Sequence, residues 1–456
     1  MNPRRSRRRI FLISTVLSLF MLYQLLHLGL LGSQRQTLQV QESAGSIIKD
    51  PVRKEDDDIP HPVCPPLPGM EDVLVVMKTG VTEAYEKVPI HLNTTLRCIP
   101  NYVIFSDFEE DIDGVRIHDA FRHLDPEVKR QVPDFDLYNR LQQMGREGLK
   151  MQDFQDEANS AVGKPNNPGW KLDKWKFLPM VKETLQYKED AKWYFFMEAD
   201  TYPVWPNLLA WLSKFNPDQP HYIGTETQIG DVIFAHGGSG FVISNPALRR
   251  AVGAYVADPV GINTYTDFHW AGDCVLGKVL FDVGVPLRFS WPLLQNSNLG
   301  ELDEFTQDFY RRPWCFPAVA LHHLSPADIR SLWVFEQRRL NVSDKHNNMI
   351  LHKDIFTGLI QPSLSSTPRE NWDNFSPEPR AAAVASADDC HSFCLQHPEC
   401  VQYSFKHGLK RCFTSKTPRL GVKSAGSERI TSGWMLNRVQ QMVREAGVCE
   451  KVDFGI

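Results

Sequence analysis

The chain has 456 residues, of which 42% are hydrophobic and 23% charged, and its formal net charge is −5 at pH 7. This length is enough for one large domain and a smaller one. The mildly acidic balance, together with the lack of a basic stripe, argues against a nucleic-acid-binding protein.

The first 62 residues predict a membrane anchor and a stem. Five arginines in residues 1–9 precede an apolar segment at 10–32 that is long enough to span a bilayer. Because positive charge precedes this segment and none directly follows it, the N-terminus is expected in the cytoplasm and the body in the lumen. A cleavable signal peptide is the alternative, but the long apolar run and the lack of a clear small-residue cleavage site favour an anchor. The polar tract at 33–62 is typical of a flexible stem.

Cysteines and glycosylation motifs point to the same compartment. Nine cysteines suggest disulfides, and their odd number leaves one thiol or one pairing open. Three sequons are present, although Pro377 weakens the third: Asn93-Thr94-Thr95, Asn341-Val342-Ser343 and Asn374-Phe375-Ser376. A basic N-terminus and a membrane span also fit residence in the endoplasmic reticulum.

Short apolar runs that alternate with helical segments predict an open α/β sheet with parallel strands. Residues 72–77 and 102–105 are expected to be strands, ending at Lys78-Thr79-Gly80 and Ser106-Asp107. Residues 172–186 carry apolar side chains at helical spacing, and residues 208–215 predict a second amphipathic helix.

Between these helices, an aromatic strand at residues 193–198 ends in two carboxylates one residue apart. Side chains two apart on a strand point to the same face, so Glu198 and Asp200 could approach one hard cation together. Such a cation, Mn²⁺ or Mg²⁺, would in turn hold a diphosphate. An acidic surface loop after a core strand is the alternative.

Two downstream segments add candidate site residues. Residues 234–244 join Gly237-Gly238-Ser239-Gly240 to an apolar strand, and glycine lets the backbone approach a ligand closely. An ordinary turn is the alternative there. Asp273 begins a helix at 273–280, where it is either a capping residue or a general base at the mouth of a site.

Together with Leu321-His322-His323-Leu324, these segments in this order resemble the inverting β-1,3-glycosyltransferases of the Fringe and core 1 galactosyltransferase group, glycosyltransferase family 31, and most closely its fungal branch. The similarity covers residues 72–336. It implies a Rossmann-like nucleotide-sugar domain of the GT-A type, with Mn²⁺ and a UDP-sugar held by an Asp-rich triplet. Glu198-Ala199-Asp200 falls on that triplet, with Glu198 and Ala199 in place of its first two acids.

The resemblance also implies roles for single residues. Asp200, His322 and Glu198 are the implied metal ligands, whereas His323 falls where relatives can have an aromatic residue. Asp273 is the implied catalytic base, with Asp267 and Asp282 as alternatives. The implied donor-binding residues are Thr79, Gly80, Asp107, Asp173, Lys174, Glu198, Gly238 and Ser239. Trp170 and Trp175 lie beside the donor segment, and packing within a helix explains them equally well.

The C-terminal part has a different character. Residues 360–387 are rich in Pro, Ser and Ala and are expected to be a linker. The closely spaced cysteines that follow favour a disulfide-stapled module over a zinc site with nearby histidines. Residues 388–456 resemble a PAN or apple domain, which implies the pairs Cys390–Cys412 and Cys394–Cys400. Such a module would recognise the acceptor or merely stabilise the protein.

The remaining cysteines are assigned less directly. Cys64 and Cys98 flank the first strand unit, and Cys274 and Cys315 are a candidate pair. Cys449 has no evident partner.

The resulting expectation is a type II Golgi membrane protein with a lumenal transferase domain at residues 63–359. It would move galactose, glucose or N-acetylglucosamine from a UDP-sugar to a glycan or glycoprotein hydroxyl in β-1,3 linkage. A homodimer is a further option. The competing class is an inactive transferase-fold protein that acts as a lectin-like or chaperone-like module, which Glu198 and Ala199 could support. A two-carboxylate hydrolase has less support, because no second acid with a raised pKa is evident.

Overall fold

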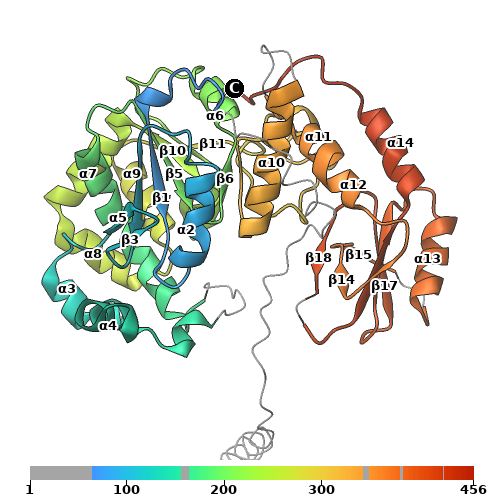
Figure 1. Ribbon diagram of the computed structural model, residues 1–456, viewed down its shortest axis with the longest axis horizontal. Helices are drawn as coiled ribbons and strands as arrows, with labels where there is room; N and C mark the ends of the chain where they lie inside the picture. Colours follow the sequence, from blue (N-terminus) through green and yellow to red (C-terminus); the bar gives the residue numbers. More distant parts are fainter. Residues whose placement is uncertain (1–63, 156–163, 343–348, 381–383, 425) are drawn as a thin grey trace, which may run out of the picture. The chain divides into compact units, whose positions relative to one another are not determined.

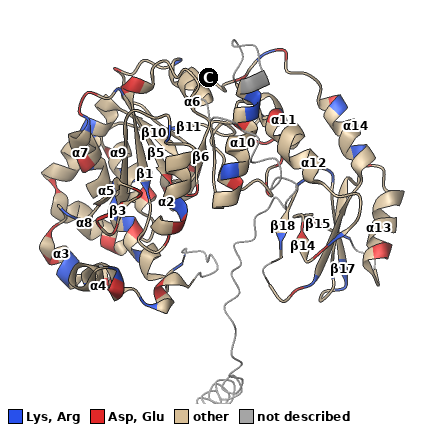
Figure 2. Cartoon of the chain, viewed as in Figure 1, with Lys and Arg blue, Asp and Glu red and all other residues tan. Residues whose placement is uncertain are grey.

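The computed structural model describes residues 64–155, 164–342, 349–380, 384–424 and 426–456 (Figure 1). The tail, membrane segment and stem expected at residues 1–62 lie outside these ranges. Within the described ranges, no helix combines the length and the apolar character needed to cross a bilayer. Positive and negative side chains are interspersed over the helices, as Figure 2 shows.

An eight-stranded sheet forms the centre of the larger part of the chain, with the order β11-β7-β10-β5-β1-β2-β4-β3. Its strands are β1 (Val73–Lys78), β2 (Tyr102–Ser106), β3 (Glu110–Ile112), β4 (Val115–Asp119), β5 (Trp193–Glu198), β7 (Tyr222–Gly224), β10 (Phe241–Ser244) and β11 (Leu287–Phe289). The central strand β1 pairs in parallel with β2 and β5, as expected. The sheet is nevertheless mixed, because β10 runs antiparallel to β5 and β7. The chain reverses before β10 through the hairpin of β8 (Glu226–Ile229) and β9 (Val232–Ala235).

Helices cover both faces of this sheet (Figure 1). Alternate side chains of β1 enter two apolar clusters: Leu74 and Val76 face one cluster, and Val73, Val75 and Met77 face the other. The first cluster includes residues of α5 (Pro168–Tyr187), α7 (Asn245–Ala257) and α9 (Gly272–Asp282), and the second includes residues of α2 (Ala84–Asn93) and α6 (Trp205–Leu212). This three-layer arrangement confirms the predicted α/β class.

Helix α5 begins four residues before the predicted start. The Asn167 side chain accepts a hydrogen bond from the Trp170 amide, and Pro168 occupies the first helical position. Trp175 lies in the core, as helix packing predicts, and its Nε1 donates to Asp134 at 3.0 Å. Capping, rather than apolar spacing, therefore sets the start of this helix.

The parallel pairing brings three strand ends to one edge of the sheet. Lys78 at the end of β1 is in register with Phe105 in β2 and with Glu198 in β5. The residues that follow these strands, including Thr79, Asp107 and Asp200, therefore lie at the same edge, where open α/β sheets bind ligands.

The C-terminal part contains a second sheet, with the order β13-β19-β16-β17-β15. Its strands are β13 (Arg369–Glu370), β15 (Glu378–Pro379), β16 (Gln402–Lys406), β17 (Arg411–Ser415) and β19 (Ile430–Trp434), and β14 (Trp372–Asp373) pairs separately with β18 (Val422–Lys423). Part of the expected linker thus forms β13, β14 and β15. Composition could not reveal these strands, because each has two residues and is held by partners distant in the chain.

Four disulfides are present among the described residues: Cys64–Cys98, Cys315–Cys449, Cys390–Cys412 and Cys394–Cys400. Both pairs implied by the PAN resemblance are confirmed: Cys390–Cys412 attaches α13 (Ala387–Gln396) to β17, and Cys394–Cys400 ties the same helix to the segment before β16. The predicted pair Cys274–Cys315 is wrong. Cys274 is a buried free thiol in α9, whereas the C-terminal tail brings Cys449 to Cys315.

Disulfide removal should destabilise the protein more where the bond closes a longer segment of chain. Cys315 and Cys449 are 134 residues apart, and Cys394 and Cys400 only 6. Chain entropy then predicts a loss of about 5 kcal/mol for the double alanine variant of the first pair and about 2 kcal/mol for that of the second. Equilibrium denaturation in urea would measure both losses. Equal losses would contradict an entropic origin.

A buried carboxyl lies behind the site region, in α10 (Pro326–Val342). Glu336 Oε2 accepts a hydrogen bond from the Tyr202 hydroxyl at 2.6 Å, and Glu336 is 9% exposed. Burial raises the pKa of Glu336 to about 7, against a usual value of 4.5. The folded protein therefore keeps this proton at a pH at which the unfolded chain has lost it, so stability is lost as the pH rises from 4.5 through 7.

We expect Glu336→Gln to remove this pH dependence while keeping an acceptor for Tyr202. The variant should be more stable than the natural protein at pH 8, by at most about 3 kcal/mol, and this advantage should vanish near pH 4.5. Urea denaturation at the two pH values measures the difference. An advantage of the same size at both pH values would mean that folding does not raise the pKa of Glu336.

The sequons differ in accessibility. Asn93 at the end of α2 is exposed, and its side chain donates to the Pro89 carbonyl. Asn374 is fully buried, with its Nδ2 donating to the Tyr403 carbonyl at 3.0 Å. The third sequon is therefore inaccessible in the folded protein.

Candidate active site

The two carboxylates predicted from the sequence lie at the end of β5: Glu198 is its last residue and Asp200 follows two positions later, whereas Ala199 between them points the other way. Ala199 is 1% exposed and belongs to the apolar cluster beneath α2 and α6. An acid at this middle position would therefore point into the core. The His91 Nε2 bonds the Ala199 carbonyl at 2.9 Å, and the Thr201 hydroxyl accepts from the Glu198 amide at 3.1 Å. These contacts fix the loop that presents Glu198 and Asp200.

His322 reaches Asp200 through a short pair of antiparallel strands. Tyr202 in β6 (Tyr202–Pro203) is in register with Leu321 in β12 (Ala320–Leu321), so the residues before β6 meet those after β12. His322 Nε2 lies 3.1 Å from Asp200 Oδ1 and 3.8 Å from Glu198 Oε2. A pairing across strands, invisible in the sequence, thus joins residues more than a hundred positions apart.

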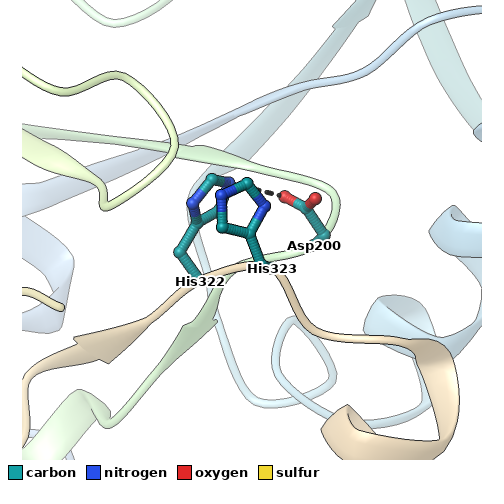
Figure 3. A group of neighbouring side chains, drawn as sticks. All are labelled: Asp200, His322 and His323. Atoms are coloured by element: carbon teal, nitrogen blue, oxygen red, sulfur yellow. Dashed lines mark ion pairs between the residues drawn. The ribbon is translucent and has the colours of Figure 1, made fainter. Parts of the chain in front are cut away.

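Asp200, His322 and His323 form a group whose ligand atoms all lie within 4.8 Å of one another (Figure 3). Asp200 Oδ1 and His322 Nε2 are buried and face each other as an ion pair, but neither makes a hydrogen bond of good geometry, which is uncommon for buried polar atoms. His323 has a left-handed backbone with φ of 56°, a costly conformation for histidine that often occurs at functional sites. One carboxylate and two imidazoles are ligands suited to Mn²⁺ and similar ions. The residues present therefore fit a metal site.

The charges of this group depend strongly on one another. Burial lowers the pKa of His322, but Asp200 and Glu198 outweigh it and raise that pKa to about 9. Burial raises the pKa of Asp200, but His322 and Lys87, 3.5 Å from Oδ2, hold it well below its usual range. The carboxylate is therefore ionised at neutral pH, and a proton on His322 supplies the positive charge that a bound cation would replace.

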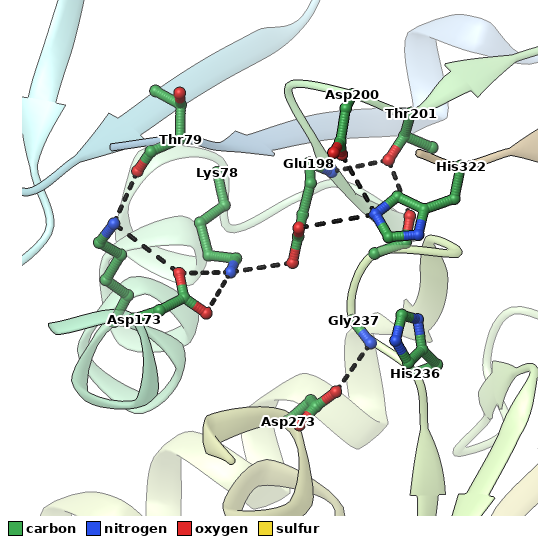
Figure 4. Close-up of polar contacts among 12 residues, drawn as sticks. Lys78, Thr79, Asp173, Glu198, Asp200, Thr201, His236, Gly237, Asp273 and His322 are labelled. Atoms are coloured by element: carbon green, nitrogen blue, oxygen red, sulfur yellow. Dashed lines mark hydrogen bonds and ion pairs between the residues drawn. The ribbon is translucent and has the colours of Figure 1, made fainter. Parts of the chain in front are cut away.

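Glu198 is held by a lysine rather than by the histidine pair. Lys78 Nζ lies 2.9 Å from Glu198 Oε1 and 2.5 Å from Asp173 Oδ2, and the Lys78 side chain is 7% exposed (Figure 4). Burial raises the pKa of Glu198, yet the charges of Lys78 and His322 hold it well below its usual range. Glu198 is thus an ionised partner of Lys78 at the margin of the metal group.

A second buried lysine joins the ends of β1 and β2. Lys176 Nζ donates to the Thr79 carbonyl at 2.8 Å and lies 3.4 Å from Asp107 Oδ2, which has no hydrogen-bond partner. Asp107 Oδ1 accepts from the Val81 amide at 2.7 Å, directly after Gly80. Thr79, Gly80 and Asp107 are therefore brought together as the sequence predicts.

The glycine-rich loop passes directly over the histidine. A Cβ on Gly238 would come within 2.1 Å of the His322 ring, so only glycine fits there. The Gly238 carbonyl accepts from the Thr201 hydroxyl at 2.8 Å, and the Ser239 amide donates to His236 Nδ1 at 3.2 Å. The loop thus packs against the His322 ring of the metal group.

Asp273 approaches the same loop from the start of α9. Its Oδ2 accepts from the Gly237 amide at 2.9 Å, and a Cβ on Gly237 would lie 3.4 Å from both Asp273 and Glu198. Burial raises the pKa of Asp273 to about 6, although hydrogen bonds from Gly237 and Cys274 oppose the shift. Asp273 lies in the first turn of α9, and its Oδ1 also accepts a hydrogen bond from the Cys274 amide at 2.9 Å.

The two alternative bases occupy different surroundings. Asp282, at the end of α9, is 52% exposed and pairs with Lys278. Asp267 is exposed near the end of α8 (Pro259–Phe268), and its backbone carbonyl accepts from Lys174 Nζ at 3.0 Å. Of the three carboxylates, Asp273 is the one that accepts a hydrogen bond from the glycine-rich loop beside the metal group.

Sequence reasoning missed several residues of this region. Lys78 and Lys176 form the network around Asp173, whereas the predicted Lys174 contacts Asp134 at 2.9 Å. Lys78 was visible as a charged residue at the end of an apolar strand. Lys176, at 2% exposed, could have been found as the basic position on the apolar face of α5.

Comparison with known proteins relates this site to a family. Residues 176–311 match the Fringe-like family. Over 205 residues, the chain is 29% identical to glycoprotein-N-acetylgalactosamine 3-beta-galactosyltransferase 1 of Xenopus laevis, and the match covers 41% of the chain and 57% of that relative. The chain thus spans little more than half the length of this curated relative. The Fringe-like segment includes Glu198, Asp200 and Asp273, and His322 follows it.

Proposed function

We propose that this protein is an inverting, metal-dependent glycosyltransferase of the β-1,3 type that uses a UDP-sugar donor. The main support is that a Fringe-like segment supplies both Asp200, in a group whose ligand atoms could hold a metal ion, and Asp273, a carboxyl whose pKa burial raises to about 6. The relative from Xenopus laevis is named as a 3-beta-galactosyltransferase, which favours this linkage type. Galactose, glucose and N-acetylglucosamine are all candidate donor sugars.

Asp200 and His322 would hold the cation, and His323 is within reach as a third ligand. A bound Mn²⁺ or Mg²⁺ would neutralise negative charge on the departing diphosphate. Two imidazoles favour Mn²⁺ over Mg²⁺, which prefers oxygen ligands. Because Lys78 holds the Glu198 carboxylate, we place Glu198 beside the cation rather than among its closest ligands.

Asp273 would act as the general base. It would accept the proton of the acceptor hydroxyl as this oxygen attacks the sugar from the face opposite UDP. A carboxyl with a pKa near 6 is mostly ionised at neutral pH yet retains affinity for a proton. The Gly237 amide, which donates to Asp273, would keep the carboxylate oriented during the transfer.

The donor would lie along the strand ends. Thr79, Gly80 and Asp107 are proposed to contact uridine, with Gly238 and Ser239 near the sugar. Asp173 is proposed to act through Lys78, which it contacts. Each contact remains a prediction for mutational study.

We further propose that residues 10–32 anchor the protein in the Golgi membrane as a type II protein, with the transferase in the lumen. The C-terminal module would be of the PAN or apple type, and a relation to the fungal branch of the family is part of the same proposal. A glycan or glycoprotein is the proposed acceptor.

Release of UDP from UDP-galactose, UDP-glucose and UDP-N-acetylglucosamine, with and without Mn²⁺, tests the proposed activity. We expect Mn²⁺-dependent UDP release from at least one donor. An acceptor glycan identified on a glycan array should increase the rate of this release. No release with any donor, combined with glycan binding on the array, would instead favour the lectin-like alternative.

A further inference from the structure

Four aromatic rings contact one another in a row that ends three residues before the proposed base in the sequence. The ring of Trp170, in the first turn of α5, stacks on Trp270 with a centroid separation of 6.0 Å and an angle of 20°. The Trp270 ring is nearly parallel to that of His269 at 6.3 Å, and His269 lies 5.6 Å from Tyr265 in α8. We call Trp170, Trp270, His269 and Tyr265 the aromatic row.

The aromatic row is incompletely buried, in contrast to the core aromatics of the same helices. Trp175 in α5 is 2% exposed, whereas Trp170, Trp270 and His269 are only partly buried and Tyr265 is 37% exposed. Aromatic rings that stack on one another and still face solvent are typical of binding surfaces, where they offer apolar area at little entropic cost.

The fold holds the row in a fixed position. Lys174 Nζ bonds the Asp267 carbonyl and pairs with Asp134, which attaches the end of α8 to α5. A Cβ on Gly272 would lie 2.5 Å from the Lys174 carbonyl, so the start of α9 touches α5 directly. These contacts set Trp270 against Trp170.

The aromatic row is also close in sequence to Asp273, the proposed base. Trp270 precedes Asp273 by three residues, so their Cα atoms are at most about 11 Å apart. The hydroxyl that gives its proton to Asp273 belongs to the acceptor. The rest of the acceptor molecule must therefore lie on the surface around Asp273. The apolar face of a pyranose ring matches an aromatic face in shape and polarity.

We propose that the aromatic row, above all Trp270 and Trp170, is the acceptor subsite and stacks on a hexopyranose ring of the acceptor glycan. This inference rests on the proposed glycosyltransferase function. It assigns the row a substrate class, the saccharide part of the acceptor, rather than a peptide or a lipid. It also makes Lys174 a positioning residue for acceptor binding.

Saturation-transfer NMR can test the subsite without turnover, in the presence of UDP and Mn²⁺. The probes are the methyl glycosides of galactose, N-acetylgalactosamine, glucose and N-acetylglucosamine. We expect at least one to bind the natural protein, and Trp270→Ala and Trp170→Ala to weaken that binding about tenfold or more. Binding of none of the four would overturn the inference.

Two variants separate stacking from folding. Trp270→Phe keeps an aromatic face and should retain most of the affinity that Trp270→Ala loses. Tyr187→Ala is the matched control, because Tyr187 is 54% exposed at the opposite end of α5 and should leave probe binding unchanged. Equal probe affinity in the natural protein and Trp270→Ala would refute the inference.

Slow acceptor-independent hydrolysis of the UDP-sugar distinguishes the two proposals. In Trp270→Ala the KM for the acceptor should rise and the ratio of transfer to hydrolysis should fall, whereas Tyr187→Ala should keep hydrolysis and acceptor KM at the natural values. Absence of hydrolysis and transfer in the natural protein would contradict the proposed function, even if the probes bind. Unchanged acceptor KM with active hydrolysis would contradict only the subsite.

Discussion

Asp200→Asn is expected to lower the turnover of a UDP-sugar by at least about a thousandfold, because it removes the carboxylate charge proposed to hold the cation. The Asp200 side chain is 19% exposed and lies between His322 and Lys87. An amide of the same shape preserves packing but is a weak metal ligand, so the loss should appear in kcat and in Mn²⁺ affinity together.

Three measurements on purified Asp200→Asn test this expectation. UDP release gives the turnover, the electron paramagnetic resonance signal of free Mn²⁺ gives the metal affinity, and circular dichroism shows whether the fold persists. Asp190→Asn is the matched control, since Asp190 precedes β5 at the opposite end of the same strand and pairs with Lys188 on the surface. Full turnover in Asp200→Asn would exclude a metal role for this residue.

Asp273→Asn has the second large expected effect, a loss of transfer of about a hundredfold to ten-thousandfold, because general bases contribute that much. Donor and Mn²⁺ affinity should change little, since Asp273 contacts the Gly237 amide rather than the metal group. Burial raises the pKa of Asp273, so ionisation costs stability above the usual value of 3.8, and the neutral amide should fold at least as well at neutral pH.

The pH profile gives an independent test of the same base. Because the carboxylate is the active form and its pKa is about 6, kcat/KM of the natural enzyme should rise about tenfold per pH unit below 6 and level off above 7. Asp282→Asn, a neutralisation at the other end of α9, should keep both rate and profile. An Asp273→Asn variant with the natural profile would move the base to Asp267 or elsewhere.

Local patterns predicted the elements that carry the site better than the site itself. Runs of apolar residues identified β1, β2 and β5, since a buried strand needs apolar side chains on both faces. Helix α5 was recognisable from the spacing of its apolar residues, but its first residue is set by the Asn167 cap and by Pro168. The short strands β13 to β15 left no local signal, because their stability comes from distant partners.

The same contrast applies to the site. The strand-end position of Glu198 and Asp200 follows from sequence periodicity, whereas the partner of each carboxylate does not. The pairing of β6 with β12 brings His322 next to Asp200, and the register of β1 with β5 brings Lys78 next to Glu198. Neither pairing is recorded in the local sequence. The family resemblance placed His323 at a position where relatives can have an aromatic residue. In the structure, its ligand atom lies with those of Asp200 and His322.

The sequence by itself therefore determined the α/β class, the positions of β1, β2 and β5 and the acidic end of β5, because these depend on apolar runs and helical spacing within short segments. Tertiary structure alone decided which charges meet. It paired Cys315 with Cys449, turned Ala199 into the core and set Asp273 against the glycine loop. Such contacts join residues far apart in the chain, and their energies depend on burial and distance, which no local pattern records.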